Sequence, residues 1–232
     1  MNVPELIECK TTLLFDLFHT LTALEFHWPG TKLTCEMLGV SREAWNHQLL
    51  ECSPDRLTGK ITDPEQIIGQ MAHAIDPNIP DTLITEVTAT RIKRFESAMS
   101  GIPLENVDIL QTLRDKGKKL ALISNADVME IQAWERASPI AKLFDVTVFS
   151  CHVGYAKPDP KIYQLTMREL AVDAKDCLFI GDGGSGELKG AQDCGITTVM
   201  ITGLIQELWP ERIESRKPYA DFVIEHLSEL IA

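Results

Sequence analysis

The sequence predicts an α/β fold, in which a Rossmann-like parallel sheet core carries an inserted α-helical subdomain. Short apolar runs recur along the chain, helical patterns separate most of them, and a long segment after the first run has helical character with little strand character. Continuous apolar runs suit strands that are covered on both faces. Strands that alternate with helices indicate a parallel sheet.

The apolar runs give the predicted strands, and the segments between them give the predicted helices. The strands are residues 12–15, 120–124, 146–150, 178–181 and 197–201, with a weaker sixth at 221–224. The helices are residues 160–170, 187–193 and 107–116, the last of which ends at Gly117, a residue that commonly terminates helices.

The helical insertion is predicted between two parts of the core. Ser41 can cap a helix over 42–50, Asp63 with Pro64 opens one toward residue 74, and a longer one runs from Pro80 toward Gly101. Residues 51–62 are predicted to form a loop. The predicted domains are therefore a core of residues 1–22 and 102–232 and a helical subdomain of residues 23–101.

Composition and charge limit the classes of function. The 232 residues are 44% hydrophobic and carry a net charge of −12, which argues against a broad nucleic-acid-binding face but permits a small anionic substrate. The first ten residues lack the pattern of a signal peptide, and the run 12–17 is too short to cross a membrane. A cytoplasmic protein with no membrane partner and six reduced cysteines is expected, and the oligomeric state is left open.

Polar residues follow the first two predicted strands, and ligands collect at the carboxyl ends of parallel strands. Asp16 directly follows the first strand, where a carboxylate either acts as a nucleophile or caps a turn. Ser124 and Asn125 end the second strand. The Ser124 hydroxyl can bind a substrate oxygen, cap the next helix, or do both.

Two further segments carry charged side chains suited to an anion and a metal. Lys157 precedes a Pro-Asp-Pro turn and is either an anion ligand or an ordinary surface lysine. Asp182 and Glu187 bracket a glycine-rich loop at the end of the fourth strand. They can bind Mg²⁺ directly or through water, or they can belong to a glycine turn beside a helix N-terminus.

The order and spacing of these residues resemble the haloacid dehalogenase superfamily, in the branch with a helical cap inserted after the first strand. The resemblance spans nearly the whole chain, although the cap is supported only by its length and helicity. The matching residues are Asp16 and Thr20, Ser124, Lys157-Pro158-Asp159, and Gly181-Asp182 with Glu187.

This resemblance implies a Mg²⁺-dependent hydrolase of a small phosphorylated molecule, with Asp16 attacking phosphorus. Mg²⁺ would be held by Asp16, by the backbone carbonyl of Phe18 and by Asp182, with Glu187 in support.

The remaining matches supply catalytic and substrate-binding residues. Ser124 and Lys157 would hold the transferring group and complete the catalytic set with Asp16. Thr20 would orient the Asp16 loop, and Thr20 and Asn125 form the expected substrate-binding set.

The sequence departs from the phosphatase pattern at position 18. The family's second aspartate, which protonates the leaving group, is replaced by Phe18, and His19 stands where glycine is usual. Loss of such acid–base catalysis costs roughly 10²–10⁴ in rate. His19 is a candidate replacement acid.

Three functional hypotheses follow. An aromatic residue at position 18, together with Tyr163, resembles the dehalogenase branch, whose halide leaves without a proton. Dehalogenases use no metal, so Asp182 and Glu187 favour a Mg²⁺-dependent phosphohydrolase instead. The third hypothesis is a ligand-binding protein that has lost turnover. Substrate selectivity is expected to depend on the cap and on residues 21–29, where Phe26 and Trp28 are candidate pocket residues.

Overall fold

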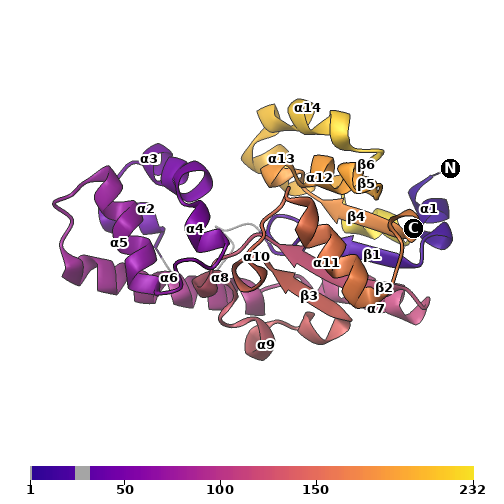
Figure 1. Cartoon of the computed structure of the whole chain (residues 1–232), viewed down its shortest axis with the longest axis horizontal. Coiled ribbons are helices and arrows are strands. Elements are labelled where there is room, and N and C mark those ends of the chain that lie inside the picture. Colours follow the sequence, from indigo (N-terminus) through magenta and orange to yellow (C-terminus); the bar gives the residue numbers. More distant parts are fainter. Residues whose placement is uncertain (1, 24–31) are drawn as a thin grey trace.

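The computed structural model describes residues 2–23 and 32–232, which form two lobes (Figure 1). The larger lobe contains a six-stranded parallel sheet with the order β3-β2-β1-β4-β5-β6. The expected α/β fold is therefore confirmed. The strands are β1 Thr12–Phe15, β2 Lys119–Ser124, β3 Val146–Phe149, β4 Cys177–Gly181, β5 Thr197–Ile201 and β6 Phe222–Ile224.

The strand order brings the first and fourth strands together. β1 pairs with β2 on one side and with β4 on the other, so that Phe15 is in register with both Leu122 and Ile180. The chain winds toward β3 on one side of β1 and toward β6 on the other. The direction of winding therefore reverses between the neighbouring strands β1 and β4, and open α/β sheets bind ligands at such a switch point.

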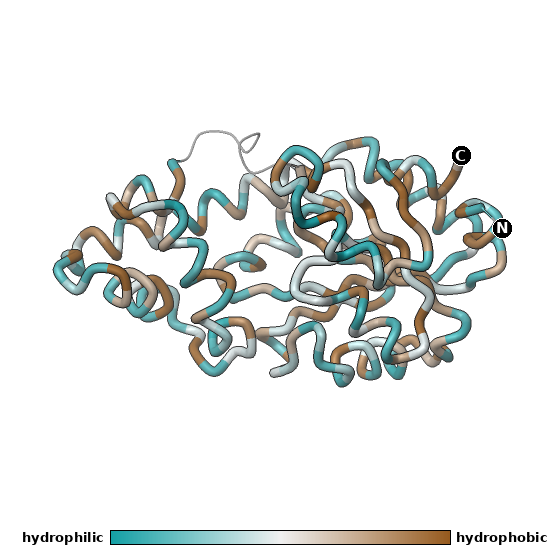
Figure 2. Tube along the Cα trace, turned by 90° about the horizontal axis from the view of Figure 1, so that it is seen from above, coloured by the Kyte–Doolittle hydropathy of each residue, from teal (hydrophilic) through white to brown (hydrophobic). Residues whose placement is uncertain are grey.

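Alternating side chains of the strands build a separate hydrophobic core on each face of the sheet. Leu13 and Phe15 point into one core and Leu14 into the other. Figure 2 shows the strands as a hydrophobic centre surrounded by more polar helices. Helices covering the first face are α1 Val3–Cys9, α7 Leu104–Asp115, α9 Trp134–Ala137 and η8 Leu227–Leu230; those covering the second are α11 Pro160–Leu170, α12 Glu187–Asp193 and α13 Gly203–Leu208.

Short helical elements complete the core lobe. They are α8 Val128–Ile131, α10 Ser150–Val153 and α14 Ile213–Arg216, with the 3₁₀ turns η3 Ala141–Leu143, η4 Ala174–Asp176, η5 Gly184–Gly186, η6 Pro210–Arg212 and η7 Lys217–Tyr219. The predicted helix 107–116 begins three residues earlier, at Leu104, and stops before Gly117, whose φ of 79° requires the left-handed conformation that glycine tolerates.

The smaller lobe is helical, and we refer to it as the cap. Its elements are α2 Thr34–Leu38, α3 Arg42–His47, the π-helical turn η2 Gln48–Cys52, α4 Pro54–Leu57, α5 Pro64–Ile75 and α6 Asp81–Ser100. Residues of α2, α3, α5 and α6 form a third hydrophobic core, to which Met129 of α8 also contributes. The exact division at residues 22 and 101 stays a prediction.

The loop predicted over residues 51–62 is wrong in part. The chain continues from α3 through η2 to Cys52, and Pro54 then begins α4. α4 carries Arg56, which is 5% exposed and donates from Nη1 to Asp127 Oδ2 at 2.8 Å. This short helix is thus stabilised by an ion pair with the core that local sequence does not indicate.

Three other expectations concern cysteines, membranes and the first loop. All six cysteines are free. Among the described residues, no helix combines the length and apolar character needed to span a membrane. Phe26 and Trp28, the candidate pocket residues, lie outside the described residues.

Candidate functional site

Asp16 lies directly after β1, at the centre of the sheet, and is 7% exposed. Its backbone N–H donates to the carbonyl of Ile180 at 2.9 Å, which continues the β1–β4 pairing by one residue. The Thr20 hydroxyl donates to Asp16 Oδ2 at 3.2 Å. The first loop therefore restrains the carboxylate on one side.

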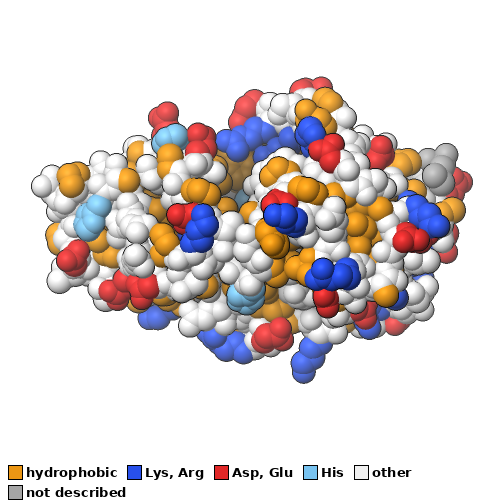
Figure 3. Space-filling view, viewed as in Figure 1, with side chains coloured by type: hydrophobic (Ala, Val, Ile, Leu, Met, Phe, Trp, Pro, Cys, Tyr) orange, Lys and Arg blue, Asp and Glu red, His pale blue; other side chains and the backbone are white. Residues whose placement is uncertain are grey.

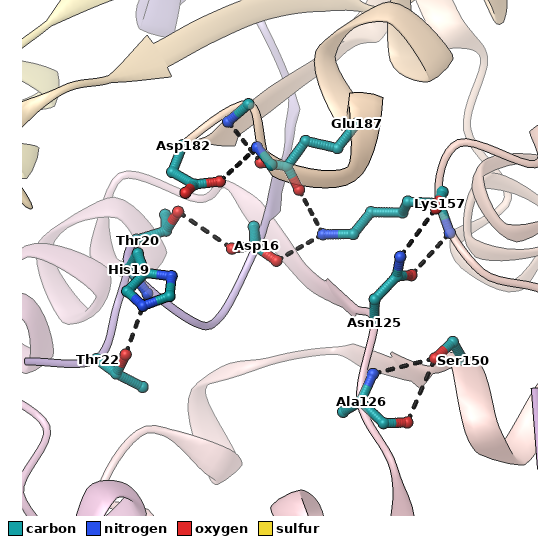
Figure 4. A network of polar contacts seen from close by, with 12 residues as sticks. Asp16, His19, Thr20, Thr22, Asn125, Ala126, Ser150, Lys157, Asp182 and Glu187 are labelled. Atoms are coloured by element: carbon teal, nitrogen blue, oxygen red, sulfur yellow. Dashed lines mark hydrogen bonds and ion pairs between the residues drawn. The ribbon is translucent and has the colours of Figure 1, made fainter. Parts of the chain in front are cut away.

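Lys157 joins Asp16 to Glu187 across the switch point (Figure 4). Its Nζ donates to Asp16 Oδ1 and to Glu187 Oε2, each at 2.5 Å, and all three side chains are buried. Tyr163 supports the other end of this arrangement, because its hydroxyl donates to the Glu187 carbonyl at 2.7 Å. The structure thus brings a predicted nucleophile, a cation and a second carboxylate together from β1, the loop before α11, and α12.

In the glycine-rich loop after β4, backbone N–H groups donate hydrogen bonds to the side chains of Asp182 and Glu187. Gly184 N–H donates to Asp182 Oδ1 at 2.6 Å, and Gly183 N–H donates to Glu187 Oε1 at 2.9 Å. A Cβ at Gly181 would lie 2.2 Å from Glu187 Oε1. Glycine is therefore required at position 181 for Glu187 to approach the strand end.

Asp16, Asp182 and Glu187 form a cluster of three buried carboxylates whose potential ligand atoms all lie within 4.8 Å of one another. The oxygen donors and their close grouping suit Mg²⁺, which is bound through carboxylates and retained waters. Each of the three carboxylates accepts hydrogen bonds at both of its oxygens.

The electrostatics of the cluster follow from its burial. Burial raises the pKa of Asp16, with Asp182 adding to the effect and Lys157 opposing it. Burial also raises the pKa of Glu187 well above its ordinary value. For Lys157, burial alone would lower the pKa, but the charges of Asp16 and Glu187 outweigh it and the pKa is raised. Lys157 is therefore a permanent cation, and a second cation here would favour the ionised carboxylates.

Ser124 and Asn125 occupy different positions relative to this cluster. Ser124 is fully buried, and its hydroxyl has no hydrogen-bond partner within residues 2–23 and 32–232. Buried hydroxyls are normally satisfied, so Ser124 has donor capacity left for a ligand. The Asn125 side chain exchanges two hydrogen bonds with the Lys157 backbone, at 2.7 and 2.8 Å, and so holds the lysine loop.

Phe18 and His19 follow Asp16 in the first loop, and each packs against an aromatic ring. The Phe18 ring packs edge-to-face on Phe95 of α6, with 5.6 Å between ring centroids. His19 has a φ of 62°, a left-handed conformation that normally favours glycine, and its ring packs against Trp209 at 5.1 Å. The departure at position 18 thus places an aromatic contact with the cap beside the carboxylate cluster.

Arg216 is a site residue that sequence reasoning missed. Its Nη1 donates to the backbone carbonyl of Asp182 at 2.9 Å and to Asp182 Oδ2 at 3.0 Å. Its side chain also packs over Gly183. Arg216 lies in a polar C-terminal segment without a motif, so no sequence signal marked it.

A second buried ion-pair network joins the cap to the core. Arg56 of α4 and Arg91 of α6 both bind Glu130 of α8, with the Arg91 contact at 2.7 Å. Asp127 pairs with Arg56 and caps α8 through the backbone N–H groups of Met129 and Glu130. Ion pairs therefore hold the segment that follows Ser124 and Asn125 against the cap.

Comparison with known proteins identifies the family. A model of haloacid dehalogenase-like hydrolases matches residues 10–195, and the chain belongs to that family. Glyceraldehyde 3-phosphate phosphatase of Methanopyrus kandleri is 28% identical over 128 residues, which cover 54% of this chain and 53% of that enzyme. The chain spans about half the length of this relative and smaller shares of several others.

Solved structures share the fold. L-2-haloacid dehalogenase of Xanthobacter autotrophicus has a TM-score of 0.66 and 18% identity, with 95% of this chain and 96% of that one covered. A haloacid dehalogenase family enzyme of Bacteroides thetaiotaomicron, solved with magnesium and inorganic phosphate, has a TM-score of 0.62 and 22% identity, with 83% and 94% covered. At these identities the likeness extends to the fold alone.

Proposed function

We propose that this hydrolase is Mg²⁺-dependent, acts on a small phosphorylated metabolite and uses Asp16 as its nucleophile. The observation that carries the proposal is the buried cluster of Asp16, Asp182 and Glu187, whose ligand atoms lie within 4.8 Å of one another. Three buried carboxylates are costly to maintain unless cations neutralise them. A dehalogenase, which needs no metal, has no use for two of them.

Each residue has a defined task in this mechanism. An Asp16 oxygen attacks phosphorus, the bond from phosphorus to the leaving oxygen breaks, and that oxygen departs with the electron pair. Water then attacks the phosphoaspartate, which releases inorganic phosphate and restores the Asp16 carboxylate. Lys157 and the Ser124 hydroxyl bind the oxygens of the phosphoryl group throughout.

The metal would be held by Asp16, Asp182 and the Phe18 carbonyl, with Glu187 in support. Bound Mg²⁺ would offset the negative charge of the phosphoryl oxygens. Because Phe18 cannot donate a proton, the leaving oxygen departs unprotonated or receives a proton from His19 or water.

Binding of Mg²⁺ is expected to stabilise the fold. A ligand at a hundred times its Kd stabilises the native state by about 2.7 kcal/mol, which corresponds to a rise in Tm of roughly 5–10 °C for a chain of this size. Thermal melts with millimolar Mg²⁺ and with chelator measure the shift. Asp182→Ala should abolish it, whereas Asp193→Ala, which removes an exposed carboxylate of α12, should retain it. Equal wild-type melting curves would refute a metal site.

Arg216 is expected to position Asp182 for the metal rather than compete with it. Groups that hydrogen-bond a metal ligand typically contribute 10–100-fold to metal affinity. Arg216→Ala should therefore weaken Mg²⁺ binding by about that factor in isothermal titration calorimetry, and Arg216→Lys should recover part of the loss. A tighter Mg²⁺ complex in Arg216→Ala would instead mean that Arg216 acts as a competing cation.

A second candidate is a 2-haloacid dehalogenase-like activity, favoured by the aromatic Phe18 at the acid position. Tyr163 is less informative, because its hydroxyl is engaged by a backbone carbonyl. A panel of phosphoesters, acyl phosphates and 2-haloacids, each assayed with Mg²⁺ and with chelator, separates the two activities. Chelator-resistant halide release would replace the phosphohydrolase proposal. Mg²⁺-dependent phosphate binding without any turnover would indicate a binding protein.

A further inference from the structure

A cavity of about 210 Å³ lies between the cap and the core. Its core wall includes Phe18, His19, Asn125 and Ser185, which lie within two positions of site residues in the sequence. Its cap wall comes from α2, α3, η2, α4 and α6. Figure 3 shows basic side chains at the edge of the hollow between the two lobes.

Aromatic rings are concentrated in this cavity. Of the described residues that line it, four are aromatic, namely Phe18, Trp45, Phe95 and Trp209, whereas aromatic residues make up only 6% of the sequence. Two come from the core lobe and two from the cap, so a ligand in the cavity meets rings from both lobes. Rings arranged in this way favour a flat apolar group, because aromatic pairs gain energy beyond the area they bury.

The cavity is also basic, although the chain as a whole carries a charge of −12. Of the described residues that line it, four are arginines and one is a glutamate: Arg42, Arg56, Arg91, Arg94 and Glu130. Even with Asp127 counted beside Glu130, these arginines outnumber the carboxylates. A locally basic cavity attracts an anion despite the acidic surface elsewhere.

Two of these arginines are held rigidly. The Arg91 guanidinium lies 4.7 Å from the centroid of the Phe95 ring and donates to Glu130 at 2.7 Å. Arg56 is fixed by Asp127 and by the carbonyl of Leu49. Prearranged side chains lose little conformational entropy when a ligand binds.

The size of the cavity limits the ligand to about one ring with a substituent. A buried apolar cavity of about 150 Å³ is known to bind benzene, and pockets for drug-sized ligands exceed about 300 Å³. At about 210 Å³, the cavity has room for a single ring and a small charged group.

We propose that this cavity binds the leaving group of the substrate, and that this group is a single flat ring carrying a carboxylate. The substrate is then an aryl-type phosphate. The proposal rests on the proposed phosphohydrolase function and explains the loss of the acid at position 18. A phenolic oxygen, with a pKa of about 10, leaves as an anion far more readily than an alkoxide, whose conjugate acid has a much higher pKa.

Binding of the released phenol product tests the cavity without requiring turnover. With Mg²⁺ and inorganic phosphate present, 4-hydroxybenzoate should quench the fluorescence of Trp45 and Trp209 and bind at least about tenfold more tightly than phenol, since contacts to charged groups are worth this much. Cyclohexanol should bind more weakly than phenol. Calorimetry provides an independent measure of the same affinities.

Variants separate the two features of the cavity. Trp209→Ala should weaken the binding of 4-hydroxybenzoate and of phenol by a similar factor. Arg91→Gln should leave phenol binding unchanged and reduce the affinity for 4-hydroxybenzoate to that for phenol. Because Arg91 is buried, Arg42→Ala, at an exposed position, provides a second charge variant that leaves the fold intact. Arg136→Ala, which removes an exposed arginine paired with Glu96 outside the cavity, is the matched control and should change neither affinity.

The kcat/KM values of three phosphate esters provide a second test of the proposal. 4-Carboxyphenyl phosphate should exceed phenyl phosphate in kcat/KM by at least about tenfold, and cyclohexyl phosphate should be the poorest of the three. Mg²⁺-dependent hydrolysis of other phosphoesters without saturable 4-hydroxybenzoate binding would overturn the cavity proposal and leave the phosphohydrolase standing. Binding of 4-hydroxybenzoate without any Mg²⁺ effect or hydrolysis would overturn the phosphohydrolase and, with it, the role of the cavity as a leaving-group site.

Discussion

Asp16→Asn is expected to abolish hydrolysis while the protein remains folded. The amide oxygen is a poor nucleophile, and loss of a nucleophile or of its activating residues in other hydrolases costs roughly 10⁴–10⁶-fold in kcat. Asparagine has nearly the shape of aspartate: its amide oxygen can still accept the hydrogen bond from Lys157, and its NH₂ group can donate to the Thr20 hydroxyl. Initial rates on the best substrate of the panel, together with a far-ultraviolet circular dichroism spectrum, measure the effect.

The control for this experiment is a carboxylate of similar burial outside the cluster. Asp127 is fully buried, caps α8 and has no proposed contact with the phosphoryl group. Asp127→Asn should therefore retain much more activity than Asp16→Asn, even if it is less stable. Turnover by Asp16→Asn near the wild-type rate would eliminate the covalent mechanism.

Phe18→Asp is expected to raise turnover of substrates with strongly basic leaving groups by up to about 10²–10⁴-fold, the usual contribution of acid–base catalysis. Proton donation matters in proportion to the basicity of the departing oxygen. Alkyl phosphates should therefore gain most, and aryl or acyl phosphates much less. The comparison of kcat/KM for an alkyl and an aryl phosphate in both proteins measures this difference.

Two structural effects must be separated from the chemistry in this variant. The substitution removes the ring contact with Phe95 and places another carboxylate near Asp16, which raises carboxyl pKa values. Phe18→Leu removes the aromatic contact without adding an acid and serves as the matched control. If Phe18→Asp binds Mg²⁺ normally yet gains nothing on any phosphoester, the missing acid does not limit turnover, and the dehalogenase or binding-protein hypothesis gains support.

Residues with local signals in the sequence were placed well by sequence reasoning. The strand 12–15 and the acid that follows it were predicted because a short apolar run bounded by polar residues suits a buried parallel strand. The structure has β1 over the same residues, with Asp16 directly after it. The glycine-rich loop after residue 181 was predicted in the same way, since glycine permits the close backbone approach seen between Gly181 and Glu187.

Residues whose surroundings depend on distant segments were not predicted. Arg56 stands 71 positions from Asp127 in the sequence, and the helix that carries it was expected to be a loop. Arg216 stands 34 positions from Asp182 and reaches it only because the C-terminal segment folds back against the loop after β4. Ion pairs of this kind have no periodicity or composition that marks them in the chain.

The sequence by itself determined the α/β class, the strands, the acids that follow β1 and β4, and the lysine in the turn before α11, because hydrophobic periodicity and turn residues act within a few positions. Only the tertiary structure decided that β1 and β4 are neighbours, that Lys157 joins Asp16 to Glu187, and that aromatic rings from both lobes share one cavity with arginines. The physical reason is that crossover connections and the packing of the cap on the core set these distances, and both depend on the whole chain at once.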